Sequence, residues 1–327
     1  MRILITGATG FIGRNYLLRC LGRGWRVVAP VRDELKLRQQ LAAEGLEAEQ
    51  VQVLPADRIA SWGDLRGLDA AVLTAGVLFE REPERYLRVN VEWTGAVLAA
   101  LPERCPVVVL SSQSAGGPCP RGASSRTERD PDVPTSWYGE SKLRMERMIR
   151  RDFAGRPLAI LRPCMVFGPR DNATLQLFRM VRFPVWLKPG MKPKFLSFLA
   201  CEDLLDAIDL ALERSQLLNE ESYYVASRRV VSDGELVRAA AQSVGARGIL
   251  LSLPHGVVRC VSAIVDGVAM LRASFPSLTR DRVREMLEER WVVNPSAFEN
   301  LTGWYARRTL AQALEEAAAY ARGRGQL

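Results

Sequence analysis

Histidine is almost absent from this chain of 327 residues, and its cysteines form no pair with metal-ligand spacing. His255 is the only histidine, and six cysteines lie far apart: Cys20, Cys105, Cys119, Cys164, Cys201 and Cys260. A zinc site needs closely spaced Cys or His ligands, so we predict no metal site. A chain of this size folds without disulfides, and no secretory leader precedes the first predicted strand. We therefore expect reduced cysteines and a soluble, cytoplasmic protein.

Long apolar runs are also missing. A membrane-spanning helix needs ~18–20 apolar residues, and the nearest stretch, 256–271, contains Arg259 and Asp266. This stretch is typical of a buried helix or of a helix lying on a membrane surface, so we predict no membrane span. Low-complexity segments and solenoid-type repeats are absent as well, which argues against disorder and repeat architectures.

The net charge is +8 and comes mostly from arginine. A basic protein can attract nucleic acid, acidic lipid or phosphorylated small molecules, but the same charge also fits arginines that are simply solvated. No compact basic tract is interleaved with aromatic residues. We therefore predict a small-molecule substrate and no nucleic-acid partner.

Short apolar runs alternate with helical patterns along the first half of the chain. We predict strands at 2–6, 26–31, 50–54, 70–74, 106–111 and 158–162, and helices at 12–22, 85–101 and 137–152. Such alternation is typical of α/β proteins, so the expected fold is a doubly wound parallel Rossmann sheet.

After Arg162 the alternation stops, and five prolines punctuate a loop-rich region with helical patterns from Glu202 and Asp233. Irregular segments that follow a regular sheet often bind substrate. We therefore predict a smaller C-terminal substrate-binding lobe. The expected division is a Rossmann domain at 1–165 with a return at 201–226, and a lobe formed by 166–200 and 227–327.

Three glycines, Gly7, Gly10 and Gly13, follow the first predicted strand in the segment TGATGFIG and open the first helix. The first would make a tight turn, the second would admit a pyrophosphate, and the third would let helix and strand pack closely. The N–H groups at the helix start would then face the anion. The residues assigned to this nucleotide site are Gly7, Thr9, Gly10, Phe11, Ile12 and Gly13.

The end of the second predicted strand bears on the cofactor type. Rossmann folds that bind NAD place an acid there, whereas this strand ends at Val31 and is followed by Arg32. A cation could accept the 2′-phosphate of NADP(H), which we therefore favour over NAD(H). Asp33 is a competing candidate for a ribose contact, and a merely solvated Arg32 is the alternative interpretation.

Tyr138 and Lys142 lie four residues apart in YGESK, on one face of a predicted helix. A lysine ammonium nearby favours the phenolate, so Tyr138 could exchange a proton with a carbonyl or alcohol oxygen. A serine should polarise the same oxygen. We choose Ser112, at the end of the strand VVVL, and keep Ser111 and Ser114 as alternatives.

Taken together, these residues resemble the extended short-chain dehydrogenase/reductase family, the NAD(P)-dependent epimerase/dehydratase group. TGATGFIG, the Ser112–Tyr138–Lys142 set and RVNVEWTG occur in family order, and LRPCMVFGPRDN, FLACEDLLDAI and LTGWYARRTL resemble its later segments. The resemblance implies hydride transfer at a carbonyl or secondary alcohol and often a homodimer. The further cofactor-site residues that it implies are Asp57, which would contact adenine, Ala75, Gly76, Asn90, Lys142 and Pro163.

Two departures from the family pattern concern the substrate. The family usually has Val-Tyr-Gly where this chain has Ala115, Gly116 and Gly117, so we expect open space beside the serine or a lost substrate contact. Gln113 and Ser114 stand where dehydratases commonly have an Asp-Glu pair, which argues against dehydration.

Three functions therefore remain. We lean to a nucleotide-sugar epimerase, on family frequency alone. The alternative is an NADPH-dependent carbonyl reductase acting on an apolar ketone, as in the dihydroflavonol-reductase and 3β-hydroxysteroid-dehydrogenase branches. A non-catalytic NADP-sensing protein is disfavoured because Ser112, Tyr138 and Lys142 are all present.

Overall fold

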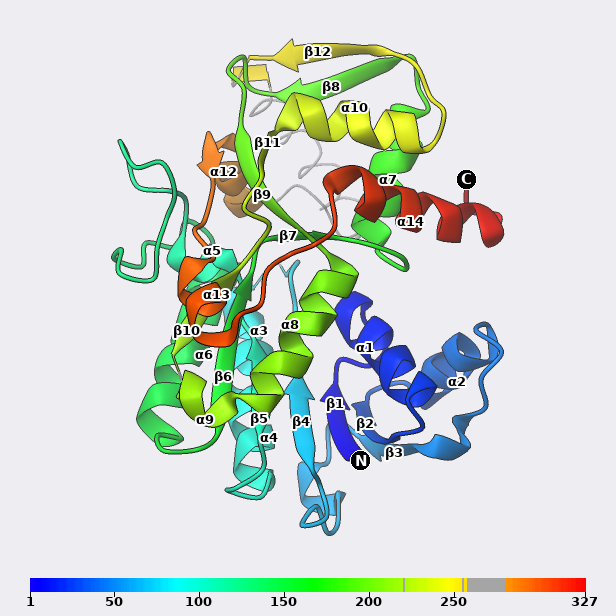
Figure 1. Cartoon of the computed structure of the whole chain (residues 1–327), viewed down its shortest axis with the longest axis vertical. Coiled ribbons are helices and arrows are strands. Elements are labelled where there is room, and N and C mark those ends of the chain that lie inside the picture. Colours follow the sequence, from blue (N-terminus) through cyan, green and yellow to red (C-terminus); the bar gives the residue numbers. More distant parts are fainter. Residues whose placement is uncertain (81, 220, 255, 258–279) are drawn as a thin grey trace.

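The computed structural model describes residues 1–80, 82–219, 221–254, 256–257 and 280–327. Its main feature is a parallel seven-stranded sheet with the order β10-β6-β5-β4-β1-β2-β3 (Figure 1). The strands are β1 (Arg2–Thr6), β2 (Arg26–Val31), β3 (Val51–Pro55), β4 (Ala70–Leu73), β5 (Val107–Leu110), β6 (Leu158–Pro163) and β10 (Ser222–Val225). Such short, almost wholly apolar strands suit a sheet that is covered on both faces.

Helices cover both faces of this sheet, as a doubly wound fold requires. One layer contains α1, α2 and α8, and the opposite layer contains α4 and α6. The helices associated with the sheet are α1 (Phe11–Gly22), α2 (Glu34–Ala42), α3 (Pro83–Leu87), α4 (Thr94–Ala100), α5 (Gln113–Gly116), α6 (Trp137–Asp152), α8 (Cys201–Glu213) and α9 (Ser215–Leu218). The predicted α/β Rossmann class is therefore confirmed.

Two details of this region differ from the sequence-based expectation. The helix predicted at 85–101 is divided: a π-helical segment, Arg88–Trp93, separates α3 from α4. The chain does come back to the large sheet after the lobe begins, because α8 packs on it and β10 pairs with β6. Farther along the chain, Phe298 and Trp304 belong to the same buried cluster as α8, so 227–327 also contributes to this core. The proposed domain division stays a prediction.

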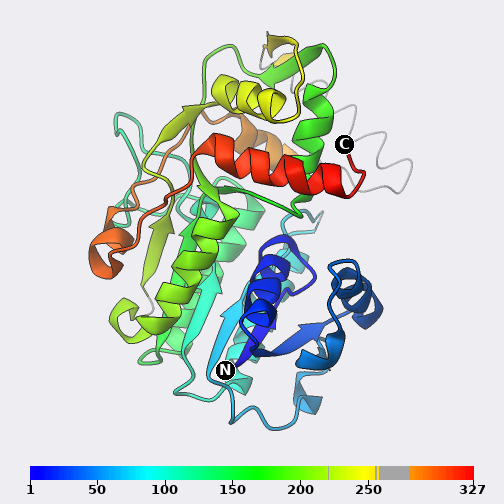
Figure 2. The ribbon, with the colours of Figure 1, turned by 45° about the vertical axis from the view of Figure 1, so that its right-hand side comes forward.

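The remaining elements form a smaller lobe above the carboxyl ends of the strands (Figure 2). Here the sequence predicted loops, whereas the structure contains short strands that pair across long sequence separations: β9 lies between β11 and β13 and also pairs with β7, and β8 pairs with β12. The strands are β7 (Met165–Phe167), β8 (Val185–Pro189), β9 (Phe195–Ala200), β11 (Val230–Ser232), β12 (Ile249–Leu253) and β13 (Arg290–Trp291). The helices are α7 (Asn172–Val181), α10 (Asp233–Ser243), α12 (Arg280–Leu287) and α14 (Leu310–Gly323). The short helix α13 (Ser296–Thr302) instead packs beside β10 of the large sheet.

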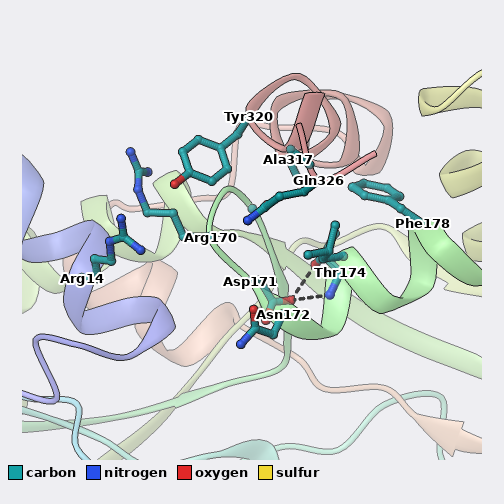
Figure 3. Close-up of a pocket in the computed structure, with 12 residues that line it drawn as sticks. Arg14, Arg170, Asp171, Asn172, Thr174, Phe178, Ala317, Tyr320 and Gln326 are labelled. Carbon is teal, nitrogen blue, oxygen red and sulfur yellow. Dashed lines mark hydrogen bonds between the residues drawn. The ribbon is translucent and has the colours of Figure 1, made fainter. Parts of the chain in front are cut away.

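The turn between β7 and α7 contacts both the lobe and the helix layer that contains α1, α2 and α8, which we call the first helix layer. Arg170 has a φ of 70°, which is uncommon for a residue other than glycine, and its guanidinium lies 4.6 Å from the ring of Tyr320 on α14. Figure 3 shows Arg170 with Arg14 of α1 on one side and Tyr320 on the other, around a small pocket. None of the predicted catalytic residues lines this pocket.

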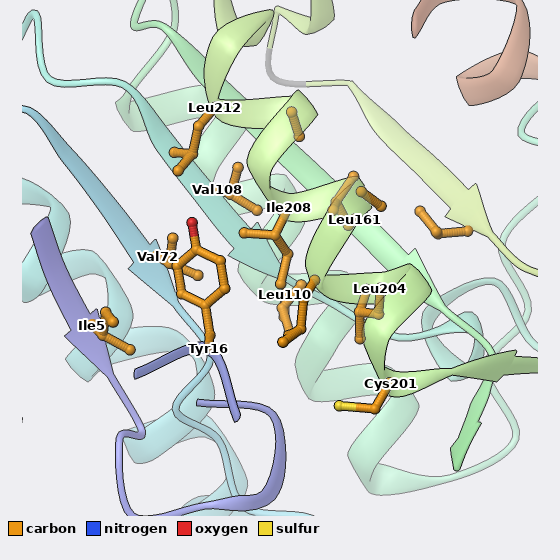
Figure 4. Close-up of a cluster of buried hydrophobic side chains, with 14 of the residues drawn as sticks. Ile5, Tyr16, Val72, Val108, Leu110, Leu161, Cys201, Leu204, Ile208 and Leu212 are labelled. Atoms are coloured by element: carbon orange, nitrogen blue, oxygen red, sulfur yellow. The ribbon is translucent and has the colours of Figure 1, made fainter. Parts of the chain in front are cut away.

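The largest buried cluster lies between α8 and the large sheet. Leu204, Ile208 and Leu212 recur at helical spacing on one face of α8, and Figure 4 shows them directed toward Val108 and Leu161 of the sheet. Burying each such side chain contributes about 1.5–3 kcal/mol. This packing keeps the sheet, and with it the edge that carries the predicted site, in a fixed position.

Several sequence-based expectations concern residues that the structure does not describe. Most of the apolar stretch 256–271 lies outside the described residues, as do His255 and Cys260. The five cysteines that are described are unbonded thiols. In the described part of the chain, no helix combines the length and apolar character that crossing a bilayer demands.

Candidate active site

The three glycines in the turn after β1 and at the start of α1 differ in how much space surrounds them. A Cβ at Gly7, whose φ is 70°, would lie 2.7 Å from Oγ1 of Thr74, and one at Gly13 would lie 2.3 Å from the carbonyl oxygen of Gly7. Both positions therefore exclude a side chain. A Cβ at Gly10 would meet only the oxygen of Gly7, at 3.2 Å. The space above Gly10 is thus open, as close approach of a ligand to the backbone requires.

The start of α1 suits an anion. Gly10 is the N-cap, and no side chain caps the first turn, which contains Phe11, Ile12 and Gly13. Thr9, which precedes the N-cap, is held by α2, because Nε2 of Gln40 donates to the carbonyl oxygen of Thr9 at 3.3 Å. An uncapped helix N-terminus beside an open glycine fits the pyrophosphate of a dinucleotide.

The ends of β2 and β3 carry the residues assigned to the adenosine half. Arg32 is exposed directly after β2, and Asp57 follows the neighbouring β3 with its side chain 79% exposed. The carboxylate of Asp33 instead accepts a hydrogen bond from the backbone N–H of Lys36 at 2.8 Å and caps α2. Asp33 is therefore engaged with its own helix, whereas Arg32 faces solvent.

The segment after β4 is held against α6 by a buried asparagine. Asn90 lies in the π-helical segment, accepts a hydrogen bond from the N–H of Val77 at 2.9 Å and donates to Oγ of Ser141 at 2.9 Å. A Cβ at Gly76 would lie 3.1 Å from Oδ1 of Asn90 and 3.2 Å from Nζ of Lys142. Gly76 thus lies beside the predicted catalytic lysine, whereas Ala75 lies against the glycine turn, 2.8 Å from where a Cβ at Gly7 would stand.

Lys142 reaches from α6 to the carboxyl end of β5. Its ammonium is buried and donates to the carbonyl oxygen of Leu110 at 2.8 Å. Burial lowers the pKa of Lys142 to about 8, and the negative charge of Glu146 opposes that shift. The ammonium and its neutral form are therefore both accessible near neutral pH.

The structure distinguishes among the three candidate serines. The buried hydroxyl of Ser111 donates to Glu146, so it points into the interior. Ser112 is the N-cap of α5, and its Oγ accepts from the N–H of Ser114 at 3.1 Å. In this bond the hydroxyl of Ser112 is the acceptor. Its own proton therefore stays available for a hydrogen bond to a substrate oxygen.

Tyr138 lies half-buried in the first turn of α6, beside the helix that Ser112 caps. A Cβ at its neighbour Gly139 would lie 2.3 Å from the carbonyl oxygen of Ser114, so α5 and α6 are in close contact at this point. Ser112, Tyr138 and Lys142 therefore come from adjacent elements at the carboxyl edge of the sheet. Pro163 ends β6 at the same edge, paired with Val225.

Sequence reasoning missed a buried charge network directly behind these residues. Glu146 is fully buried and accepts hydrogen bonds from Arg162 at 2.6 and 2.9 Å and from Ser222 at 2.8 Å. Arg162 also pairs with Asp132 at 2.8 Å. The sequence does contain one indication of this network, since Glu146 follows Lys142 by four residues and so lies on the same helix face. That spacing is also common in solvated helices, so it did not single out Glu146.

With this geometry established, comparison with known proteins identifies the family. A sequence profile of the NAD dependent epimerase/dehydratase family matches residues 3–226. The chain belongs to that family. It is therefore an NAD(P)-dependent enzyme, as the sequence predicted.

Relatives of this epimerase/dehydratase-family enzyme span most of its length. A ceramide reductase from Caulobacter vibrioides is 28% identical and covers 88% of this chain and 85% of its own. Sterol demethylase protein B from Methylococcus capsulatus is 25% identical and covers 85% of both chains. The solved structure of UDP-glucuronic acid 4-epimerase from Bacillus cereus covers 99% of this chain and 100% of its own, with a TM-score of 0.75 and 19% identity. At that identity the structural likeness shows the fold alone.

One part of an expectation about this family member is wrong. Gly116 replaces the aromatic residue of the family pattern, and we expected either open space there or a lost substrate contact; the space is not open, and the lost contact stays a prediction. The phenol of Tyr224, from β10, fills that space, since a Cβ at Gly116 would lie 1.9 Å from its hydroxyl. Arg162 donates to the same hydroxyl at 3.2 Å. An aromatic ring is thus supplied from a distant strand, which no local pattern around Ser112 could indicate.

Proposed function

We propose that this enzyme is a carbonyl reductase, with NADPH as the favoured reductant, that acts on an apolar ketone or the corresponding secondary alcohol. The observation that carries this proposal is that exposed apolar side chains stand close in sequence to the predicted cofactor and catalytic residues. Leu78 is 40% exposed two residues after Gly76, Trp137 is 51% exposed next to Tyr138, and Met165 is 39% exposed just after β6.

The substrate class follows from what such a surface can bind. Apolar side chains at a site mouth gain free energy when an apolar ligand covers them, at about 25 cal/mol per Å². The names of two whole-length relatives, a ceramide reductase and a sterol demethylase protein, point to lipid substrates in those proteins. Both observations support the reductase over the nucleotide-sugar epimerase toward which the sequence alone leaned.

In the proposed reaction the residues of this chain handle the proton and the oxygen. A lysine ammonium near a phenol favours the phenolate, so Lys142, one helical turn along α6, would assist proton exchange at Tyr138. When bound at the glycine turn, reduced nicotinamide would be the source of the hydride that the carbonyl carbon accepts. The hydroxyl of Ser112 donates a hydrogen bond to the carbonyl oxygen, and Tyr138 gives that oxygen its proton.

The preference for NADP(H) is part of the proposal and rests on Arg32. Its guanidinium is exposed beside the end of β3, while the neighbouring carboxylate of Asp33 caps α2. We expect Arg32→Ala to weaken NADPH binding about tenfold or more and NADH binding much less. Arg38→Ala, on the exposed face of α2, is the matched control. An equal loss for both cofactors in Arg32→Ala would contradict the 2′-phosphate role.

The reaction is tested with purified enzyme and two substrate types. We expect NADPH absorbance to fall when a long-chain ketone in detergent is added, and to stay constant with UDP-glucose. Tyr138→Phe should lose at least about a thousandfold in rate while fluorescence titration shows retained NADPH binding. Interconversion of UDP-glucose and its epimer without net cofactor consumption would replace the reductase by the epimerase. Normal turnover of Tyr138→Phe would remove this residue from the mechanism.

A further inference from the structure

The small β8–β12 sheet exposes an apolar face at the far end of the lobe. Figure 1 shows the two strands at one end of the molecule, with α10 beneath them. Along each strand, alternate side chains point away from the interior, and these are apolar. Val185 and Leu187 of β8 are 46% and 51% exposed, and Ile249 and Leu251 of β12 are 67% and 47% exposed.

The strand register gathers these four side chains into one patch. The strands are parallel, with Val185 opposite Ile249 and Leu187 opposite Leu251, so all four project from the same face. The residues between them face inward: Trp186 is buried, and the ammonium of Lys188 pairs with Asp233 of α10 at 3.1 Å. We call the four outward residues the β8–β12 patch.

Two further apolar side chains extend this patch at its ends. Phe183, just before β8, is 68% exposed, and Met191, just after it, is 65% exposed. Exposed large apolar residues that occur singly are ordinary, but here four lie on one face of a two-stranded sheet and two more stand within two residues of β8. Exposed apolar surface of this kind marks a place where the protein contacts something apolar.

Basic side chains border one end of the patch. Arg182 precedes β8 and Arg247 precedes β12, and the register places both at the same end of the sheet. Among the described residues, neither guanidinium has an acidic partner, whereas Glu289 near the opposite end pairs with Lys192 at 3.2 Å. Apolar side chains bordered by unpaired cations match the chemistry of an anionic lipid surface.

We propose that the β8–β12 patch docks this enzyme on an anionic membrane surface. The inference rests on the proposed function, because a substrate as apolar as a long-chain ketone resides in the bilayer. The apolar side chains would enter the boundary between headgroups and acyl chains, and Arg182 and Arg247 would lie at the level of the phosphates. The enzyme would then lie on the membrane, at the source of its substrate.

The test measures binding of the full-length enzyme to substrate-free vesicles by co-sedimentation. We expect binding to vesicles containing about one-third phosphatidylglycerol, weaker binding to pure phosphatidylcholine, and a decrease as salt is raised. Leu187→Ser combined with Ile249→Ser should lower the partition coefficient about tenfold or more. Arg182→Gln combined with Arg247→Gln should lower it for the anionic vesicles only.

Matched controls separate this proposal from folding effects and from the proposed function. Leu217→Ser removes an equally exposed leucine, 54% exposed on α9, and should bind vesicles like the parent. NADPH oxidation with a short, water-miscible ketone should be unchanged in all of these variants, so failure of docking and failure of the reductase are read separately.

Three results would overturn the proposal. Absence of vesicle binding is the first, and binding that the paired serine variant leaves unchanged is the second. The third is a dimer of the parent in sedimentation velocity that the serine variant converts to a monomer, which would assign the patch to a second copy of this chain.

Discussion

Two carboxylates, each surrounded by arginines, occupy very different places in this molecule. Glu146 on α6 has no exposed surface, and its partner Arg162 is 3% exposed. Glu44, just beyond α2, is 11% exposed and contacts three arginines that are progressively more exposed, at 15%, 17% and 32%. These three are Arg14, Arg170 and Arg324. In the interior Arg162 contacts both oxygens of the carboxylate and the more exposed Arg150 lies 3.7 Å away, whereas at the border three arginines lie within 3.0 Å of one carboxylate.

The two clusters also connect different parts of the chain. Glu146 ties α6 to β5, β6 and β10, all within the large sheet and directly behind the predicted catalytic residues. Glu44 joins α1 to the β7–α7 turn and to α14, so it fastens the lobe to the first helix layer. The first cluster should therefore act on the stability of the sheet and on the site, and the second on the attachment of the lobe.

The largest effect is expected at Glu146. Glu146→Gln leaves the buried guanidinium of Arg162 without its closest countercharge, so the free energy of unfolding should fall by about 3–5 kcal/mol. Urea denaturation followed by circular dichroism measures the loss. Glu34→Gln, which breaks the exposed pair between Glu34 and Arg38 on α2, is the control and should change the value by less than about 0.5 kcal/mol. Equal losses in the two variants would mean that burial does not distinguish these pairs.

A smaller effect, dependent on pH, is expected at Glu44. Hydrogen bonds from Arg170 hold the pKa of Glu44 at about 2, below its ordinary value of 4.5. Because the folded pKa is the lower one, the stabilisation is fully present above about pH 4.5 and is lost as the pH falls toward 2. Glu44→Gln should therefore cost about 1–2 kcal/mol at pH 7 and roughly a quarter of that at pH 2.5, by urea denaturation at both values. The same loss at both values would rule out an ionic role.

The same contrast explains what could be predicted from the sequence. The strands of the large sheet are continuous apolar runs, such as VVVL at 107–110, and their alternation with helices is visible locally. The lobe strands are only two to six residues long and pair across the chain, as β8 does with β12, so no local pattern marks them. Local periodicity thus predicts the sheet but not the lobe.

In the candidate site, too, features set within one short segment could be predicted, and features set by distant segments could not. Gly7, Gly10 and Gly13 could be assigned steric roles from their spacing, since a Cβ at Gly10 or Gly13 would meet the carbonyl oxygen of Gly7 in the same turn. Tyr224 could not be placed beside Gly116, and Glu146 could not be placed beside Arg162, because the sheet order that brings them together is not written in either segment. The catalytic and cofactor assignments themselves stay predictions until the variants are measured.

The smallest effect, on the pH profile, tests whether the buried cluster reaches the chemistry. Lys142 must carry its proton to stabilise the phenolate that forms as Tyr138 gives its proton to the ketone oxygen, so kcat/KM for the ketone should decline above about pH 8, the pKa of Lys142. The charge of Glu146 holds that pKa up, and removing it should therefore move the alkaline limb of the profile to lower pH. Glu44→Gln should leave the limb in place. Profiles from pH 6 to 10, recorded where circular dichroism shows each variant to be folded, measure the difference. An alkaline limb that stays fixed in Glu146→Gln would confine Glu146 to a structural role and separate the buried network from catalysis.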